Sequence, residues 1–217
     1  MVEDYKVRRR YADELKTSAD SWRLKFFDER TCPHNFSVTD CVRLLTRNNW
    51  IRSRDTKLYA RLELKFIRQR RGEPPAYVDH NPSILACDKE IWDEADSGYP
   101  SARFIVAHEI AHVVLHDDYA QPFTSELKKA IWQIEESGEW QANTWAAYFL
   151  VSDASIAKFI TPGDIATHCA VESDIVMRRL GPNFKFSGES CPECGSCATV
   201  RSGIRLKCDA CRMIACA

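Results

Sequence analysis

The sequence predicts an α+β fold, in which a small antiparallel or mixed sheet packs on a helical core and a small cysteine-rich module follows. Apolar and polar side chains alternate over residues 58–67, a pattern typical of a half-buried strand. An otherwise apolar run over residues 103–116 carries histidines at helical spacing, and residues 187–217 hold two Cys-x-x-Cys pairs. At 217 residues the chain is long enough to bury a core of its own.

The bulk composition indicates an ordinary globular protein. Apolar residues make up 45% and charged residues 28%, and Lys+Arg 30 against Asp+Glu 31 leaves a net charge of -1, so no global field steers the chain onto nucleic acid. Residues 1–16 lack the apolar stretch of a secretory signal, and the longest apolar run, residues 145–151, is too short to span a bilayer. We therefore expect a cytoplasmic location, no membrane contact, and cysteines that are reduced or bind metal.

Residues 1–57 are expected to form an N-terminal helical region. Ser37 followed by Asp40 is typical of an N-cap with an acidic first turn. The aromatic-rich residues 22–27 before it also fit a helix. This region ends where the alternating pattern begins.

Three short strands are predicted next. The first covers residues 58–67 and ends at a Gly-Pro turn over residues 71–75. Two more are expected at residues 76–79 and 83–87, so that the sheet leads directly into the histidine-bearing helix. The apolar side of the first strand comprises Leu58, Ala60, Leu62, Leu64 and Phe66.

Helices are predicted to follow the strands. Residues 103–116 form the first, and a longer helical region covers residues 125–150, where Gly138 weakens the helix interior and can interrupt it. Shorter helices are expected near residues 155–160 and 163–180. These last segments are similar to a helix-turn-helix, which either contacts DNA or, as is commoner, forms a packed helical hairpin.

The first of these helices contains His108, Glu109 and His112 as H-E-x-x-H. Residues four apart lie on one face of an α-helix, so both imidazoles can bind the same zinc ion. Glu109 lies beside that face, where it can act as the general base towards water. The alternative is a buried helix whose histidines are satisfied by hydrogen bonds alone.

His116 continues the four-residue spacing, but it lies about 12 Å along the helix axis from His108. The three imidazoles therefore cannot bind one ion from a straight helix. We assign His116 to packing or to a hydrogen bond with a metal ligand.

Glu139 is the best candidate for the third ligand. Two histidines, one glutamate and water leave the open position that a catalytic zinc needs. Ala142 and Ala146 on the same helical face allow a close approach to the helix of residues 103–116, and Asn143 can orient the Glu139 carboxylate or a substrate carbonyl. The alternatives are that Glu139 is a surface acid or that Asp117 or Asp118 is the ligand, although these two follow the same helix closely.

Two motifs together resemble the ImmA/IrrE metallopeptidase family. The first comprises Arg103-Phe104, Ala107-His108-Glu109, His112 and His116, and the second comprises Glu139, Ala142-Asn143 and Ala146-Ala147, with Trp145 where the family often has Phe. The resemblance covers roughly residues 60–180. It implies a zincin-like fold, Glu139 as third zinc ligand and Glu109 as catalytic glutamate. It also implies that the chain cleaves or inactivates a helix-turn-helix repressor.

The C-terminal cysteines are spaced as in a zinc ribbon. Cys191 and Cys194 form one pair and Cys208 and Cys211 the other, with 13 residues between the pairs, of which residues 199–206 can form a hairpin. Four thiolates close the site, so its zinc would be structural, and a redox dithiol pair is the alternative. Cys197 and Cys216 are left over from the ribbon, although Cys197 could take the place of Cys194. Cys32, Cys41, Cys87 and Cys169 are expected as small core residues.

The sequence thus predicts three units: an N-terminal helical region (1–57), a zincin-like metallopeptidase domain (58–182) and a four-cysteine zinc ribbon (187–217). The first hypothesis is a zinc-dependent metalloendopeptidase with one catalytic and one structural zinc, whose substrate is a transcriptional repressor. The second is a non-proteolytic, zinc-dependent regulator that binds a repressor or DNA. A metal-free interaction module is the third.

Overall fold

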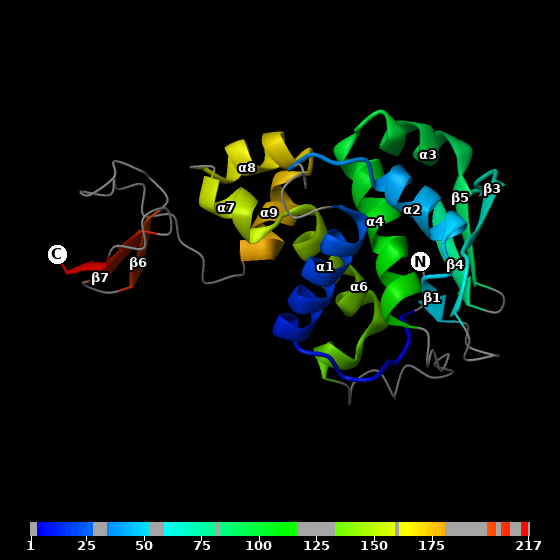
Figure 1. The fold of residues 1–217 in the computed structure, drawn as a ribbon. Coiled ribbons are helices and arrows are strands. Elements are labelled where there is room, and N and C mark those ends of the chain that lie inside the picture. The colour runs from blue at the N-terminus through cyan, green and yellow to red at the C-terminus, as the bar shows by residue number, and fades with distance from the viewer. Residues whose placement is uncertain are drawn as a thin grey trace.

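The structure is a computed structural model that describes residues 4–27, 34–52, 59–80, 83–116, 133–158, 161–180, 199–202, 205–208 and 214–216. Helices and a small mixed sheet give the α+β fold that the sequence predicts. The sheet lies on one side of helix α4 (Pro100–Leu115), and α1 and α6 lie on the other side (Figure 1). Among the described residues, no helix combines the length and the apolar character needed to cross a membrane.

The N-terminal region contains α1 (Ala12–Phe26) and α2 (Val38–Arg47), as predicted. The Ser37 side chain accepts a hydrogen bond from the backbone N–H of Asp40, which confirms the predicted N-cap. Strand β1 (Ile51–Arg52) then pairs antiparallel with β2 (Tyr59–Ala60).

The main sheet has the order β3-β5-β4, with β5 (Ser83–Asp88) in the centre. Strand β3 (Glu63–Ile67) runs parallel to β5, and β4 (Ala76–His80) runs antiparallel to it at the edge. A single strand over residues 58–67 is therefore wrong. The extended strand is interrupted between β2 and β3, where the N–H of the buried Leu62 donates to the carbonyl of Leu45 at 3.1 Å.

In the sequence, helix α3 (Lys89–Asp96) comes between the last strand of the sheet and α4. The prediction that the strands lead directly into the histidine-bearing helix is therefore wrong. The Asp88 side chain caps α3 by accepting from the N–H of Glu90. Phe66, expected on the inner side of the strand, is 48% exposed and packs edge-on against Trp92 of this unpredicted helix, with ring centroids 5.6 Å apart.

Helix α4 is the central element. It begins with Pro100 at a position where a missing N–H costs nothing, and His116 ends it. Buried apolar side chains point from this helix in all directions, which is typical of a helix buried in a core. These residues are Ala102, Val106, Ala107, Ile110, Ala111, Val113 and Leu115.

Helix α6 (Gly138–Leu150) packs along α4 (Figure 1), and the short 3-10 turn η1 (Ile134–Glu136) precedes it. Ser137 is its N-cap and accepts from the N–H of Trp140. The predicted long helix over residues 125–150 is thus found only from Gly138 onwards within the described residues. Residues 117–132, with the rival ligands Asp117 and Asp118, lie outside the described residues.

The C-terminal part of the helical core contains α7 (Asp153–Lys158), α8 (Pro162–Cys169) and α9 (Ser173–Leu180). The prediction of one helix over residues 163–180 is therefore wrong. Ala170 ends α8 in the left-handed region, with φ of 48°, and α9 starts three residues later. Helices α8 and α9 contact each other and α9 contacts α6, and DNA binding by this pair stays a prediction.

The tail contains the antiparallel strands β6 (Thr199–Ser202), β7 (Arg205–Cys208) and β8 (Ile214–Cys216). The predicted hairpin within residues 199–206 is therefore present. The four-cysteine site stays a prediction, because Cys191, Cys194 and Cys211 lie outside the described residues and only the backbone of Cys208 is described. Cys32 and Cys197 lie outside them as well, whereas Cys41, Cys87 and Cys169 are buried and form no disulfide, as expected.

Candidate metal centre

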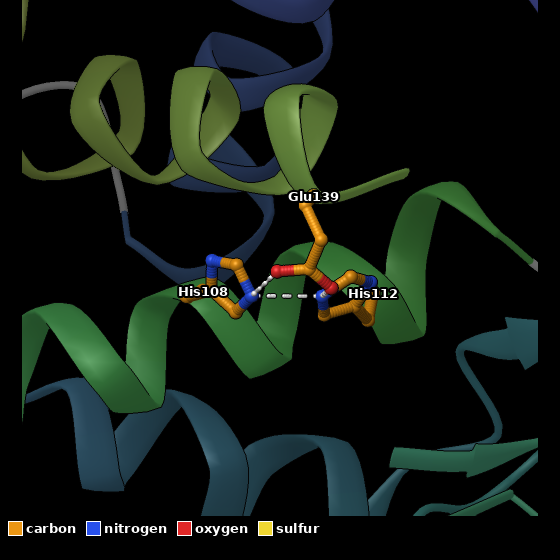
Figure 2. A group of neighbouring side chains, drawn as sticks. All are labelled: His108, His112 and Glu139. Carbon is orange, nitrogen blue, oxygen red and sulfur yellow. Dashed lines mark hydrogen bonds and ion pairs between the residues drawn. The ribbon is translucent and has the colours of Figure 1, made fainter. Parts of the chain in front are cut away.

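Helices α4 and α6 bring His108, His112 and Glu139 together. The two histidine Nε2 atoms lie 2.8 Å apart. The Glu139 carboxylate is 3.3 Å from His108 Nε2 through Oε2 and 3.4 Å from His112 Nε2 through Oε1. Figure 2 shows the carboxylate of α6 pointing at both rings of α4.

The local sequence explains this arrangement. His108 and His112 are one turn apart, so both rings leave the same face of α4. Glu139 is in the first turn of α6, and the fully buried Ala142 and Ala146 follow on its face. These small side chains let α6 approach α4 closely, so the Glu139 carboxylate reaches the rings of both His108 and His112.

The donor set fits a zinc ion. Glu139 Oε1 is a buried acceptor without a hydrogen-bond partner among the described residues, and such an atom costs about 1–3 kcal/mol unless a cation satisfies it. Two ring nitrogens 2.8 Å apart also need either a shared hydrogen or a metal ion between them, because two facing lone pairs repel. Two imidazole nitrogens and one carboxylate are ligands that zinc accepts.

The surroundings favour the charge states that metal binding requires in Glu139 and His112, but they favour the protonated form of His108. Burial by itself raises the pKa of Glu139, but the contacts with His108 and His112 outweigh it and hold the pKa well below its ordinary value. Burial lowers the pKa of His112 in spite of the Glu139 carboxylate. For His108 burial also acts downwards, but the contact with Glu139 outweighs it and raises the pKa. Glu139 is thus ionised and His112 neutral, as metal ligands require.

Asn143, which was expected to orient the Glu139 carboxylate or a substrate carbonyl, contacts His108 instead. Its Oδ1 is 3.1 Å from His108 Nδ1. An amide oxygen only accepts, so His108 Nδ1 carries the hydrogen and its Nε2 faces Glu139.

Glu109 lies next to this centre on α4 and is 7% exposed. Burial, with the nearby charge of Glu139, raises its pKa to about 7 against the opposing effect of His108. No hydrogen-bond partner of its carboxylate is found in the described part of the chain. Together with His108, His112 and Glu139 it lines a cavity of about 80 Å³, whose other walls are Tyr5, Ala76, Tyr77 and Val78.

Two residues that the sequence analysis did not single out support the centre: Tyr5 contacts His112 directly, and Gln141 contacts it through His116. The hydroxyl of Tyr5 lies 2.6 Å from His112 Nδ1 and 2.9 Å from His116 Nδ1. His116 Nε2 in turn lies 3.3 Å from Gln141 Oε1. Burial, with the charges of Glu139 and Glu109, strongly raises the pKa of Tyr5, so the phenol keeps its proton.

Comparison with known families finds the same part of the chain. Residues 94–171 match the IrrE N-terminal-like domain. This is a peptidase domain, and the matched range contains both α4 and α6. The match supports the ImmA/IrrE resemblance and a metallopeptidase-type domain over that range. Tyr5 and the cysteine-rich tail lie outside it. No curated protein matches the chain.

Proposed function

We propose that the chain is a zinc-dependent metalloendopeptidase that cleaves a protein, with a transcriptional repressor as the substrate. The observation that carries the proposal is the convergence of His108, His112 and Glu139 on one point, with the Glu109 carboxylate on the wall of the same cavity. The match to a peptidase domain over residues 94–171 supports it.

In this proposal His108, His112 and Glu139 hold the zinc ion. When bound, zinc supplies Lewis acidity, which polarises a peptide carbonyl and makes water more acidic. Glu109 accepts the proton of the attacking water on its carboxylate and returns that proton to the nitrogen of the leaving amine. Asn143 holds the His108 ring in place through Nδ1.

The shape of the cavity supports a substrate that docks along the surface. Its volume of about 80 Å³ accommodates a few water molecules. Pockets that enclose a ligand measure about 300–1,000 Å³. Ala76 and Val78 of the edge strand β4 line this cavity, and an extended segment can add to such an edge through main-chain hydrogen bonds. A repressor would thus present an extended segment beside β4.

A second, structural zinc is proposed for Cys191, Cys194, Cys208 and Cys211. The Cys-x-x-Cys spacing supports it, and so does the pairing of β6 with β7, which follows the first cysteine pair and ends at Cys208 of the second. Four thiolates leave no open position, so this zinc would stabilise the tail and take no part in hydrolysis.

The Glu109→Gln variant tests hydrolysis against binding. It removes the proton acceptor and leaves His108, His112 and Glu139 intact, so it should keep zinc and lose at least about 100-fold in cleavage rate. The control is Glu63→Gln, which changes an exposed glutamate on β3.

The substrate for this test is obtained with the same variant. Glu109→Gln serves as bait for helix-turn-helix repressors, and mass spectrometry then detects cleavage of each captured repressor by the unmodified chain. If Glu109→Gln inactivates the repressor as well as the unmodified chain does, the non-proteolytic regulator replaces the peptidase as the function.

A further inference from the structure

An extended segment at the N-terminus, residues 4–10, is fastened to the start of the ligand helix α6. We call it the N-terminal strap. The Tyr5 carbonyl accepts from the N–H of Gly138 at 2.9 Å. The Asp4 carboxylate accepts from the hydroxyl of Ser137 at 2.7 Å and from the N–H of Glu139 at 3.2 Å. The strap therefore holds the backbone of the proposed third ligand.

The Tyr5 side chain reaches past this helix end to the histidines. A Cβ at Gly138 would lie 2.7 Å from the Tyr5 ring, closer than real Cβ contacts allow. Gly138 thus lets the ring pass over the first turn of α6. The hydroxyl then lies between His112 Nδ1 and His116 Nδ1.

The direction of each hydrogen bond in this group can be worked out from Gln141. Its Nε2 lies 2.7 Å from the carbonyls of both Arg8 and Glu135, which only accept, so this end of the amide is the NH₂ group. Gln141 Oε1 therefore faces His116 Nε2, at 3.3 Å. His116 must donate from Nε2, so in its neutral form its Nδ1 is an acceptor.

The same reasoning continues to the metal ligand. Because His116 Nδ1 accepts, the Tyr5 hydroxyl donates to it at 2.9 Å. A hydroxyl has one hydrogen, so the Tyr5 oxygen accepts from His112 Nδ1 at 2.6 Å. The direct contact between the two Nδ1 atoms, at 3.0 Å, requires the same polarity. His112 Nδ1 then carries the hydrogen and His112 Nε2 presents its lone pair towards His108 and Glu139.

We propose that Tyr5 and His116 are positioning residues that hold His112, before any metal arrives, in the tautomer whose Nε2 binds metal. The inference rests on the proposed zinc centre. It makes the N-terminal strap part of that centre, although the strap is far from it in the sequence. Metal binding to His112 then needs no change of tautomer and no rotation of the ring.

Zinc affinity measures this contribution. Residues that orient a ligand typically change metal affinity by about 10–100-fold. In Tyr5→Phe, His112 Nδ1 keeps its direct contact with His116, so we expect this variant to lose less zinc affinity. The Tyr5→Phe/His116→Phe double variant should lose more. Zinc is titrated against a chromophoric chelator in the full chain, with His112→Ala as the baseline for zinc bound elsewhere. The matched control is Tyr11→Phe, an exposed tyrosine just after the strap, which should bind zinc unchanged.

The tautomer itself is visible by NMR. Long-range ¹H–¹⁵N spectra of the metal-free chain should show His112 as the Nδ1–H form and His116 as the Nε2–H form, and Tyr5→Phe should weaken the first preference. A purely structural role for Tyr5 would leave the tautomers unchanged. The inference is overturned if His112 is the Nε2–H form, or if the double variant binds zinc as tightly as Tyr11→Phe. If the unmodified chain binds no more zinc than His112→Ala, the proposed zinc centre fails instead.

Discussion

At the scale of single residues, the charge of Glu139 decides the chemistry of the proposed centre. Its contacts with His108 and His112 keep its pKa low, and its Oε1 is buried without a hydrogen-bond partner among the described residues. A glutamine of the same size would occupy the same space but supply no charge. The amide is also a much weaker ligand for zinc than a carboxylate.

Glu139→Gln should therefore reduce zinc in this centre to the level of His112→Ala. The measurement is the number of zinc ions per chain after gel filtration, determined by inductively coupled plasma mass spectrometry. Glu63→Gln, at an exposed position, should keep the zinc of the unmodified chain. Full zinc retention by Glu139→Gln would show that Glu139 is not a ligand.

Gly138→Ala tests the close approach of the Tyr5 ring. Its Cβ would lie 2.7 Å from that ring, and overpacking of this kind costs about 1–3 kcal/mol. The control is Gly163→Ala in the first turn of α8, where the nearest atom is 3.7 Å away. That substitution should stabilise by about 0.4–1 kcal/mol, because alanine restricts the unfolded chain. Urea denaturation measures both, and equal effects would mean that the Tyr5 ring does not occupy this place.

The sequence revealed the residues whose spacing within a helix is itself the signal. His108 and His112 are one turn apart, and Glu139 stands on a face of small residues, so all three could be named and the structure brings them together. Tyr5 could not be named, because its contact with His112 spans 107 residues and nothing in the local sequence indicates it. Gln141 had only its closeness to Glu139 as a signal.

At the scale of the elements, a buried arginine joins three segments that are distant in the sequence. Arg103 on α4 is 1% exposed and donates to the carbonyls of Phe36 at 2.5 Å, Cys169 at 3.2 Å and Ala170 at 3.0 Å. Two of these carbonyls belong to the end of α8, where the chain turns towards α9. Arg103 thus fixes the α8–α9 corner against the helix that carries the histidines.

Arg103→Lys should destabilise the fold by about 1–3 kcal/mol. A lysine ammonium cannot reach three separate carbonyls as the planar guanidinium does, so at least one buried acceptor loses its donor. The midpoint of urea denaturation measures the change. Arg61→Lys, at an exposed position, should stay within about 0.5 kcal/mol of the unmodified chain. A similar midpoint for Arg103→Lys would mean that these bonds contribute little.

The same corner explains why the sequence predicted one helix where there are two. Ala170 is a good helix former, and only the bonded corner holds it at a φ of 48°. Helix α3 was not predicted, although Asp88 caps it. The strand pattern before it predicts that the helix of residues 103–116 follows directly. Helix α2 was predicted correctly because its start is marked within the segment itself, by the Ser37 cap.

At the scale of the whole molecule, elements from all parts of the helical core bury their side chains in one apolar cluster. Its members include residues of α1, α2, β5, α4 and α6: Leu15, Leu45, Leu85, Ile110 and Phe149 are each fully buried. The proposed zinc centre lies beside this cluster on α4 and α6. The described strands of the cysteine-rich tail form a separate sheet, so the zinc proposed there should be independent of the first.

Metal content should accordingly divide into two parts. We expect two zinc ions per chain, of which His112→Ala removes one and Cys191→Ser removes the other. Metal analysis of the two variants and of their combination checks this, and the combination should contain no stoichiometric zinc. Loss of both ions in either single variant would contradict the independence of the two sites.

Anomalous diffraction at the zinc absorption edge, from crystals of the full chain, tests the central claim most directly. We predict a peak between His108 Nε2, His112 Nε2 and the Glu139 carboxylate, the three groups that lie within 4.8 Å of one another. A zinc-replete crystal with no peak at this point, or with the Glu139 carboxylate turned away from the ion, would contradict the account.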